Sequence, residues 1–528
     1  MRAFNVTGLC VPEEDYMVDI SEKIEKIKEL IESRSYFTIN RARQYGKTTT
    51  LAILKRELKD EYLMVSISFE GLGDESFATS AAFCEAFMQL VRRALQFTSA
   101  DERYFNAWFD PNVKDFMSLN RHIAKMCMPD EAGVGRKIVL MVDEVDKASN
   151  NAVFLHFLSM LREKFLARKQ NVDYSFHSVI LASVYDIRNI KLKMISEGAY
   201  TPAIGENKLY NSPWNIAADF DVDMSFSPAE IATMLADYEA DHGTGMDVPF
   251  IAGEVYSYTS GYPFLVSRVC HCVDKKLNKD WSQRGVLEAV NIILDESNTL
   301  FDDLYKNLEN NEKLYNLIYD ILMLGKKRTY AIGSPAIDIA RIYGIIKKTD
   351  QSAAVSNRIF ELAICNYFIA KDEELPKRRI TGVLQDDVVA EGRFDMELCL
   401  KKFAEHYAEM FNERDAEFIE REGRLLFLSY LKPLINGKGF YHIESQLTDL
   451  RRMDVVADFG REQFVVELKL WKGEAGHIKA YEQLAGYLGS KGFHTGYLLT
   501  FDFRKGMKKQ PYAKWVDHGG MRIFDVVA

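Results

Sequence analysis

Short β-rich runs alternate with helical patterns over the first 225 residues of the chain. The runs flanked by amphipathic segments are Tyr36 to Asn40, Leu63 to Ser68, Ile138 to Val142 and Ser178 to Val184. Strands that are separated by helices pair in parallel, because a helical crossover returns the chain to the same end of the sheet. The pattern therefore predicts a three-layer α/β domain with a parallel sheet between two layers of helices.

The remaining sequence predicts three further parts. Ser227 before Pro228 is typical of a helix N-terminus and begins a purely helical lid. A helix, a turn, a helix and two extended segments, Tyr343 to Lys348 and Ala353 to Asn357, favour a winged-helix-like connector. A charged linker interrupted by proline then leads to a compact α+β domain. The predicted bounds are 1–225 for the α/β core, 226–300 for the lid, 301–375 for the connector and 380–528 for the last domain.

Charge and cysteine content limit the partners and the compartment. The 528 residues include 67 basic and 77 acidic side chains, a formal net charge of −10, which excludes a uniformly basic nucleic-acid coat but permits a local basic groove. The 7 cysteines are scattered, as in proteins of a reducing compartment. No apolar run approaches the roughly 20 residues that a bilayer span needs. We expect a soluble cytoplasmic protein with no membrane partner.

A phosphate-binding loop is predicted directly after the first strand. Gly46-Lys47-Thr48 opens the following helix and matches the second half of a Walker A loop. Backbone N–H groups at such a helix start receive phosphate oxygens, the lysine reaches the β- and γ-phosphates, and the threonine ligates Mg²⁺. Arg41 stands where the first glycine of the motif is expected. The alternative is an ordinary basic helix start.

The apolar run that begins at Ile138 ends in Asp143-Glu144, as in a Walker B strand. This chemistry requires Asp143 in the Mg²⁺ shell and Glu144 as the group that polarises the attacking water. Ser183, at the end of another predicted strand, is a candidate sensor of the γ-phosphate; a plain buried serine is the alternative. Two acids at one strand end are a weak signal alone, but they gain weight from the Gly-Lys-Thr upstream.

These residues resemble bacterial AAA-like ATPases of the extended AAA/STAND class, over about Met1 to Cys272. The resemblance rests on Tyr16-Met17-Val18-Asp19, the loop from Arg41 to Thr48, Asp143-Glu144, Ser183-Val184-Tyr185-Asp186, Ser212-Pro213-Trp214-Asn215-Ile216 and Gly261-Tyr262-Pro263. Several members of that class also carry an arginine in place of the first loop glycine.

The resemblance implies ATP and Mg²⁺ as cofactors. Their expected ligands are Arg43, Gln44, Gly46, Lys47, Thr48, Thr49, Asp143 and Ser183. Gly261-Tyr262-Pro263 is expected to start a lid helix that faces the nucleotide, and Arg268 is a candidate second sensor. No arginine finger can be assigned, so a finger from a neighbouring subunit would require a homo-oligomer.

A second constellation of charged residues lies near the C-terminus. Asp454 precedes one predicted strand, and Glu467 and Lys469 lie two apart in the next, so these two share a face. A carboxylate from each of two paired strands can share a divalent metal, while the ammonium orients an attacking water. That is the chemistry of phosphodiester hydrolysis. The alternative is a half-buried strand with a solvated charged face.

The region from about Glu420 to Phe503 resembles the PD-(D/E)XK nuclease superfamily, including its Gln-x-x-x-Tyr helix motif at Gln483 and Tyr487. The family implies a further acid from its first helix, which is Glu422, with Glu420 as the competitor. DNA is the expected partner, and RNA is not excluded. The local positive charge that a nucleic-acid phosphate backbone needs comes from Arg451, Arg452, Lys491, Arg504, Lys505, Lys508 and Lys509.

The sequence leaves three functional hypotheses open. The first is an ATPase with a metal-dependent nuclease domain. The second is a STAND-like switch in which ATP holds a conformation and the C-terminal domain binds nucleic acid or another partner without cutting it. The third is an ATPase that regulates transcription through the winged helix.

Overall fold

The computed structural model describes the chain as two compact units, Met1–Ala289 with Ile342–Gly344, and Val290–Arg341 with Ile345–Ala528. The residues described are 2–98, 106, 108, 110–129, 136–148, 151–184, 214–323, 326–373, 385–390, 393–410, 427–428, 430–432, 434–435, 439–444, 454–459, 462–471, 473–502 and 512–528.

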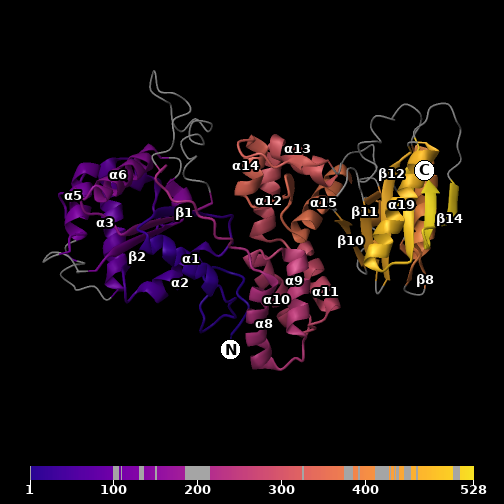
Figure 1. The fold of residues 1–528 in the computed structure, drawn as a ribbon, viewed down its shortest axis with the longest axis horizontal. Coiled ribbons are helices and arrows are strands. Elements are labelled where there is room, and N and C mark those ends of the chain that lie inside the picture. Colours follow the sequence, from indigo (N-terminus) through magenta and orange to yellow (C-terminus); the bar gives the residue numbers. More distant parts are fainter. Residues whose placement is uncertain are drawn as a thin grey trace, which may run out of the picture. The chain divides into compact units, whose positions relative to one another are not determined.

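A parallel sheet forms the centre of the first unit (Figure 1). Its described strands, in the spatial order β1-β4-β3-β2, are β1 (Tyr36–Asn40), β4 (Ser178–Ser183), β3 (Ile138–Asp143) and β2 (Leu63–Ser68). Every residue of β3 and β4 is buried, so helices must cover both faces of the sheet. Ala218 adds an isolated parallel bridge to Phe37 on the other side of β1. The predicted strands and their parallel pairing are confirmed.

Two separate apolar cores cover the two faces of this sheet. Ile27 of α1 and Leu54 of α2 belong to the core on one face, and Phe87 of α3 and Phe157 of α6 belong to the core on the other. The helices involved are α1 (Ser21–Glu32), α2 (Lys47–Leu58), α3 (Ser80–Gln96), α5 (Phe116–Met126) and α6 (Ala152–Lys169), with the short 3₁₀ helices η1 (Asp74–Phe77) and η2 (Val145–Ala148). The prediction of a three-layer α/β arrangement is confirmed.

The helical segment that follows begins as predicted. Ser227 Oγ accepts a hydrogen bond from the N–H of Glu230, and the Glu230 carboxylate accepts one from the N–H of Ser227. This reciprocal capping box starts the first lid helix immediately before Pro228. The helices of this segment are α8 (Pro228–His242), α9 (Val248–Thr259), α10 (Pro263–Lys276) and α11 (Gln283–Asp295).

The second unit begins with helices and a small antiparallel sheet of order β5-β7-β6. Its elements are α12 (Thr299–Asn310), α13 (Glu312–Leu322), β5 (Arg328–Thr329), α14 (Pro335–Ile342), β6 (Ile346–Thr349), β7 (Ser352–Val355) and α15 (Arg358–Glu373). Strands β6 and β7 correspond to the two predicted extended segments, and the winged-helix-like assignment stays a prediction. The predicted extended segment from Tyr343 starts later, at Ile346, because Gly344 adopts a positive φ of 67° and turns the chain.

The C-terminal part of the second unit contains a mixed sheet of order β10-β11-β12-β13-β15-β14. Its strands are β10 (Gly439–Glu444), β11 (Asp454–Phe459), β12 (Glu462–Leu470), β13 (Thr495–Phe501), β14 (Tyr512–His518) and β15 (Met521–Val527). The other elements are α16 (Gln385–Val388), β8 (Val389–Ala390), β9 (Arg393–Phe394), α17 (Met396–Met410) and α19 (Glu474–Lys491). β11 and β12 form a hairpin in which Phe459 pairs with Glu462.

Helix α19 covers one face of this sheet. Leu484 and Leu488 of the helix share a core with Val465 of β12 and Leu498 of β13. The sequence also predicts a helix over 416–435, and most of that range falls outside the described residues. Within the described ranges, no helix has both the length and the apolar character of a bilayer-spanning segment.

Candidate functional sites

The predicted phosphate-binding loop connects β1 to α2. Gly46 precedes the helix with a φ of 75°, and Gln44 also has a positive φ, 56°. Residues that carry a Cβ rarely adopt this left-handed backbone conformation, so glycine is the favoured residue at the helix start. The loop is thereby turned so that α2 starts at Lys47 with its N-terminal N–H groups available to a ligand.

Lys47 is 6% exposed and is held inside its own loop. Its Nζ donates hydrogen bonds to the carbonyl oxygens of Arg41 and Ala42, each at 2.9 Å. Burial lowers the pKa of the ammonium, while Asp146, Glu144 and Asp143 act in the opposite direction. The carboxylates thus favour the charged form of Lys47 at the start of α2, where a polyphosphate would be bound.

Thr48 and Asp143 lie together, as the sequence predicts. Thr48 Oγ1 donates to Asp143 Oδ2 at 2.6 Å, although the residues are 95 positions apart. Asp143 ends β3 and is 7% exposed, and its second oxygen accepts a bond from the N–H of Glu144. A hydroxyl and a carboxylate are oxygen ligands of the type that Mg²⁺ prefers. These two side chains fit the implied metal.

Glu144 follows at the end of the same strand with a φ of 51°. Burial raises the pKa of its carboxyl group, and the neighbouring charge of Asp143 raises it further. A raised pKa brings a carboxylate closer to the proton affinity that a general base needs near neutral pH. The position and the environment of Glu144 suit the predicted role.

Arg41, which replaces the first glycine of the motif, anchors the loop. Its guanidinium donates to the carbonyls of Val222 and Asn40, at 2.7 and 2.9 Å, and lies over the ring of Phe220. Its backbone N–H donates to the carbonyl of Ser183, which is 1% exposed at the end of β4. The arginine thus points toward the segment around Val222, and Ser183 lies next to the loop.

The lid and the N-terminal segment both reach this loop, a feature not predicted in detail. The hydroxyl of Tyr262 donates to the Arg43 carbonyl at 2.6 Å, and its ring lies edge-on to Tyr45 at 4.6 Å between centroids. The N–H of Cys10 donates to Thr49 Oγ1 at 3.3 Å. The Gly-Tyr-Pro motif at 261–263 indicated the lid contact. No sequence signal pointed to Cys10.

Helix α10 starts at Pro263, as expected, and Arg268 lies half-buried within it. Its role as a second sensor stays a prediction.

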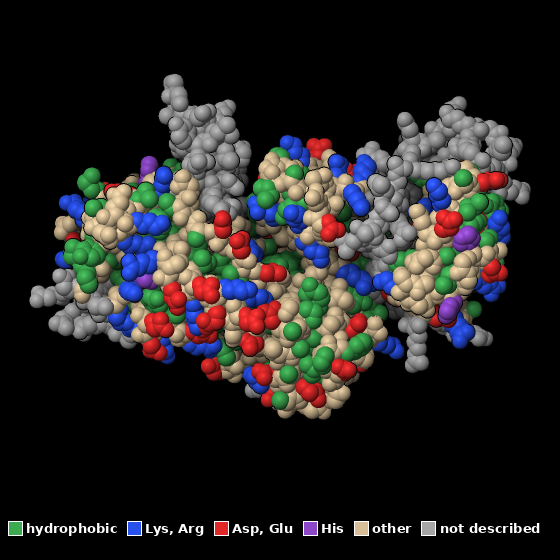
Figure 2. All heavy atoms as spheres, viewed as in Figure 1, with side chains coloured by type: hydrophobic (Ala, Val, Ile, Leu, Met, Phe, Trp, Pro, Cys, Tyr) green, Lys and Arg blue, Asp and Glu red, His purple; other side chains and the backbone are tan. Residues whose placement is uncertain are grey.

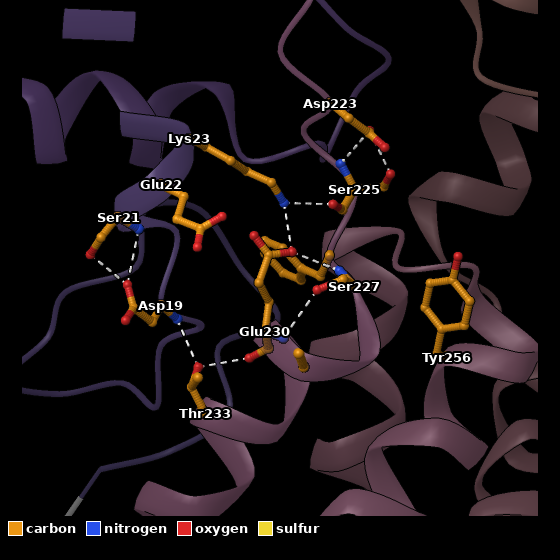
Figure 3. A pocket seen from close by; sticks show the side chains of 12 residues that line it. Asp19, Ser21, Glu22, Lys23, Asp223, Ser225, Ser227, Glu230, Thr233 and Tyr256 are labelled. Carbon is orange, nitrogen blue, oxygen red and sulfur yellow. Dashed lines mark hydrogen bonds and ion pairs between the residues drawn. The ribbon is translucent and has the colours of Figure 1, made fainter. Parts of the chain in front are cut away.

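A cavity of about 490 Å³, lined mostly by polar residues, lies between the first turn of α1 and the first turn of α8, and none of the predicted nucleotide ligands lines it (Figure 3). Lys23 crosses from α1 to donate to the Ser225 carbonyl and to Glu230, at 2.7 Å each. The N–H of Asp19 donates to Thr233 Oγ1. These bonds connect the core to the lid beside the cavity.

In the C-terminal domain, the predicted constellation is partly assembled. Asp454 and Glu467 are direct partners across the antiparallel pair β11 and β12. Glu467 is 1% exposed, and its Oε1 lies 2.8 Å from Lys469 Nζ. Val465, two residues before Glu467, belongs to the core beneath α19, so Glu467 and Lys469 share the α19 face.

Several predicted residues of this domain fall outside the described part of the chain. These are Glu420, Glu422, Arg451, Arg452, Arg504, Lys505, Lys508, Lys509 and the side chain of Asp454. Among the described residues, no three His, Cys, Asp or Glu side chains come together as a metal-ligating group. The metal-binding and catalytic roles of Asp454, Glu467 and Lys469 therefore stay predictions.

The two residues of the predicted Gln-x-x-x-Tyr motif on α19 differ in burial. Tyr487 is 4% exposed and packs in the core between α19 and the sheet, and Gln483 is half-buried. Lys491 lies over the Tyr487 ring at 5.9 Å. On the face shown in Figure 2, the described residues present both acidic and basic side chains.

The chain matches a protein family and is similar to several known proteins. Residues 16–368 match the family described as an AAA-like domain. An uncharacterised WD repeat-containing protein of Synechocystis is 23% identical over 265 residues, which are 47% of this chain and 20% of that relative. The chain thus covers about a fifth of that relative's length. The Walker-type ATPase of Pyrococcus abyssi aligns over 68% of this chain and 99% of that one, with 13% identity and a TM-score of 0.45.

Proposed function

Because the chain belongs to the AAA-like domain family, we propose that it binds and hydrolyses ATP with Mg²⁺ and uses this cycle to regulate a C-terminal nuclease. The nuclease would cleave DNA phosphodiesters with a divalent metal, in genome maintenance, mobile-element biology or defence. The proposal joins two sites, one in each unit of the chain.

The hydrogen bond between Thr48 Oγ1 and Asp143 Oδ2 carries the ATPase half of the proposal. It brings the end of β3 to the first turn of α2, and both groups are oxygen ligands suited to Mg²⁺. When bound, the metal would neutralise charge that develops on the phosphate oxygens. Lys47 would exchange its bonds to the loop carbonyls for phosphate oxygens, and Glu144 would accept a proton from the attacking water.

The pairing of Asp454 with Glu467 supports the nuclease half. Directly opposed residues on antiparallel strands have Cβ atoms about 4.5–5.5 Å apart, which is close enough for two carboxylates to share one metal ion. Lys469 already lies beside Glu467. In this arrangement its ammonium would orient the attacking water or stabilise the charge on the scissile phosphate.

A cleavage assay on full-length protein tests both halves. Linear, nicked and single-stranded DNA and RNA are incubated with Mg²⁺, with and without ATP. We expect Asp454→Ala and Lys469→Ala to abolish cleavage and to leave ATP hydrolysis unchanged, whereas Lys47→Ala should abolish hydrolysis and the dependence of cleavage on ATP. Lys479→Ala is the matched control, because Lys479 is an exposed lysine of α19 outside the site. Cleavage that survives both Asp454→Ala and Lys47→Ala would refute these residue assignments.

A second candidate function is a nucleotide-dependent switch whose C-terminal domain binds nucleic acid or another partner without cutting. The deep burial of Glu467 and its ion pair with Lys469 favour this candidate, because an ion-paired, buried carboxylate is costly to expose to a metal. DNA binding that is unchanged in Lys469→Ala, with no cleavage at any metal concentration, would select the switch over the nuclease.

A further inference from the structure

A buried polar cluster beside the Glu467–Lys469 pair has no role in the function proposed above. Asp525 of β15 is fully buried, and its Oδ2 lies 2.9 Å from His477 Nε2. The same oxygen accepts hydrogen bonds from the hydroxyls of Tyr481, at 2.7 Å, and Tyr512, at 3.3 Å. His477 and Tyr481 are one turn apart on α19. The carboxylate therefore holds the first turns of the helix onto the sheet.

The strand register places this cluster level with the predicted metal-binding residues. Glu467 pairs with Leu498, and Leu498 pairs with Asp525, so the three form one row across β12, β13 and β15. Glu467 and Asp525 both lie on the α19 face, two strands apart, or about 10 Å between backbones. Lys469 and Thr500 form the next row of the same face.

His477 connects the cluster to the end of β12 that carries Lys469. Its ring lies 4.7 Å from the ring of Trp471, between centroids. Trp471 comes two residues after Lys469, and its backbone N–H donates to the carbonyl of Phe501 at the end of β13. A shift of the His477 ring would thus be transmitted to the strand end that positions the Lys469 ammonium.

Packing alone does not account for this arrangement. Asp525 Oδ1 and Thr500 Oγ1 are buried and have no hydrogen-bond partner among the described residues. Unsatisfied buried groups are rare, and apolar residues of similar volume usually pack there at a lower free energy. A buried polar network fixes a defined geometry, however, since its donors and acceptors match in few arrangements.

We propose that Asp525 and His477 are positioning residues of the C-terminal site: Asp525 orients the His477 ring, which holds Trp471 and thereby the Lys469 end of β12 beside Glu467. This assignment rests on the proposed nuclease function. Asp525 and His477 touch neither substrate nor metal in this scheme and act through Trp471.

The test compares His477→Ala with Leu484→Val in the full-length chain. Leu484 lies in the same helix and belongs to the apolar core between α19 and the sheet, so its shortening reports loss of stability. We expect His477→Ala to lower kcat for cleavage about 10- to 100-fold, as is typical when a residue that orients a metal site is removed. The KM for DNA should stay within about threefold, because substrate contacts are unchanged. Leu484→Val should lower only the unfolding temperature.

Binding of Mn²⁺ without nucleotide supplies a readout that does not depend on cleavage, with Asp454→Ala as the blank for the C-terminal site. We expect weaker Mn²⁺ binding at this site in His477→Ala and unchanged binding in Leu484→Val. Equal kcat and equal Mn²⁺ affinity in the two variants would overturn the assignment.

The failure of the nuclease proposal can be told apart from failure of this one. If the unaltered chain cleaves nothing, the nuclease function is wrong; the positioning role then stands only if Mn²⁺ affinity depends on both Asp454 and His477, and it falls if His477→Ala binds Mn²⁺ normally. If His477→Ala does not fold, His477→Gln replaces it, because the amide retains a donor for Asp525 but lacks the ring that contacts Trp471.

Discussion

Lys47 and His177 are two buried basic side chains of the first unit, and burial lowers the pKa of both. For Lys47, nearby carboxylates of β3 and η2 counteract this effect. For His177, the neighbouring cations add to it, and its pKa falls to about 4. The carboxylates thus oppose the loss of charge from Lys47, whereas His177 is neutral at physiological pH.

Replacement of Lys47 should weaken nucleotide binding directly. A hydrogen bond to a charged group contributes about 1.5–3 kcal/mol, so Lys47→Ala should lower ATP affinity at least about tenfold. Titration with a fluorescent ATP analogue in the presence of Mg²⁺ measures the change. Arg56→Ala is the matched control, since Arg56 is an exposed cation in the last turn of the same helix. Equal losses of ATP affinity in the two variants would show that Lys47 acts only through its general positive charge.

His177 should make the first unit sensitive to acid. Its folded-state pKa of about 4 lies below the ordinary value of 6.5. Between these values the unfolded chain binds a proton that the folded chain does not, so stability falls as the pH drops through this window. The loss at pH 5 is on the order of 1 kcal/mol after allowance for solvent screening. We expect the unfolding temperature of His177→Gln to depend less on pH between 7 and 5; identical pH dependences would contradict this.

At the scale of elements, the turn between α9 and α10 positions the part of the lid that contacts the phosphate-binding loop. Gly261 in this turn has a φ of 72°, and its carbonyl accepts a hydrogen bond from the N–H of Phe226 at 2.8 Å. A Cβ at this position would collide with the backbone of Phe226. The next residue, Tyr262, is the one that bonds to Arg43.

Gly261→Ala should therefore displace α10 and weaken both the lid and the nucleotide site. The expected loss of stability exceeds about 1 kcal/mol, because alanine at a positive φ is strained even without a collision. Gly253→Ala is a matched control within α9, where an added Cβ meets nothing within 4 Å. That variant should gain about 0.5–1 kcal/mol from reduced chain entropy. Calorimetry and ATP titration measure both effects, and equal unfolding temperatures for the two variants would refute the role of the turn.

At the scale of the whole molecule, the two units have separate apolar cores and carry separate candidate sites. A ligand that binds one folded unit stabilises that unit by mass action and leaves an independent unit unchanged.

Calorimetry of the full chain should show this separation. ATP and Mg²⁺ at 100 times the dissociation constant should stabilise the first unit by about 2.7 kcal/mol and leave the transition of the second unit in place. Lys47→Ala should remove the shift. A shift of both transitions in the unaltered chain would show instead that the units unfold as one body.

The sequence by itself determined the features that depend on neighbours along the chain. The strand runs of the core, the helix N-terminus at Ser227 and the start of α2 at Lys47 agree with the structure. Each follows from a side-chain pattern only a few residues long, which local backbone geometry enforces regardless of the rest of the fold.

Only the tertiary structure decided which distant residues meet. The order β1-β4-β3-β2 puts Ser183 next to Arg41, and the row across β12, β13 and β15 brings Asp525 level with Glu467. No local pattern encodes these neighbours, because strand order depends on how helices and strands pack over the whole sheet. For the same reason the sequence revealed Glu467 and Lys469, two residues apart on one strand, but not His477, whose partner lies 48 residues further along the chain.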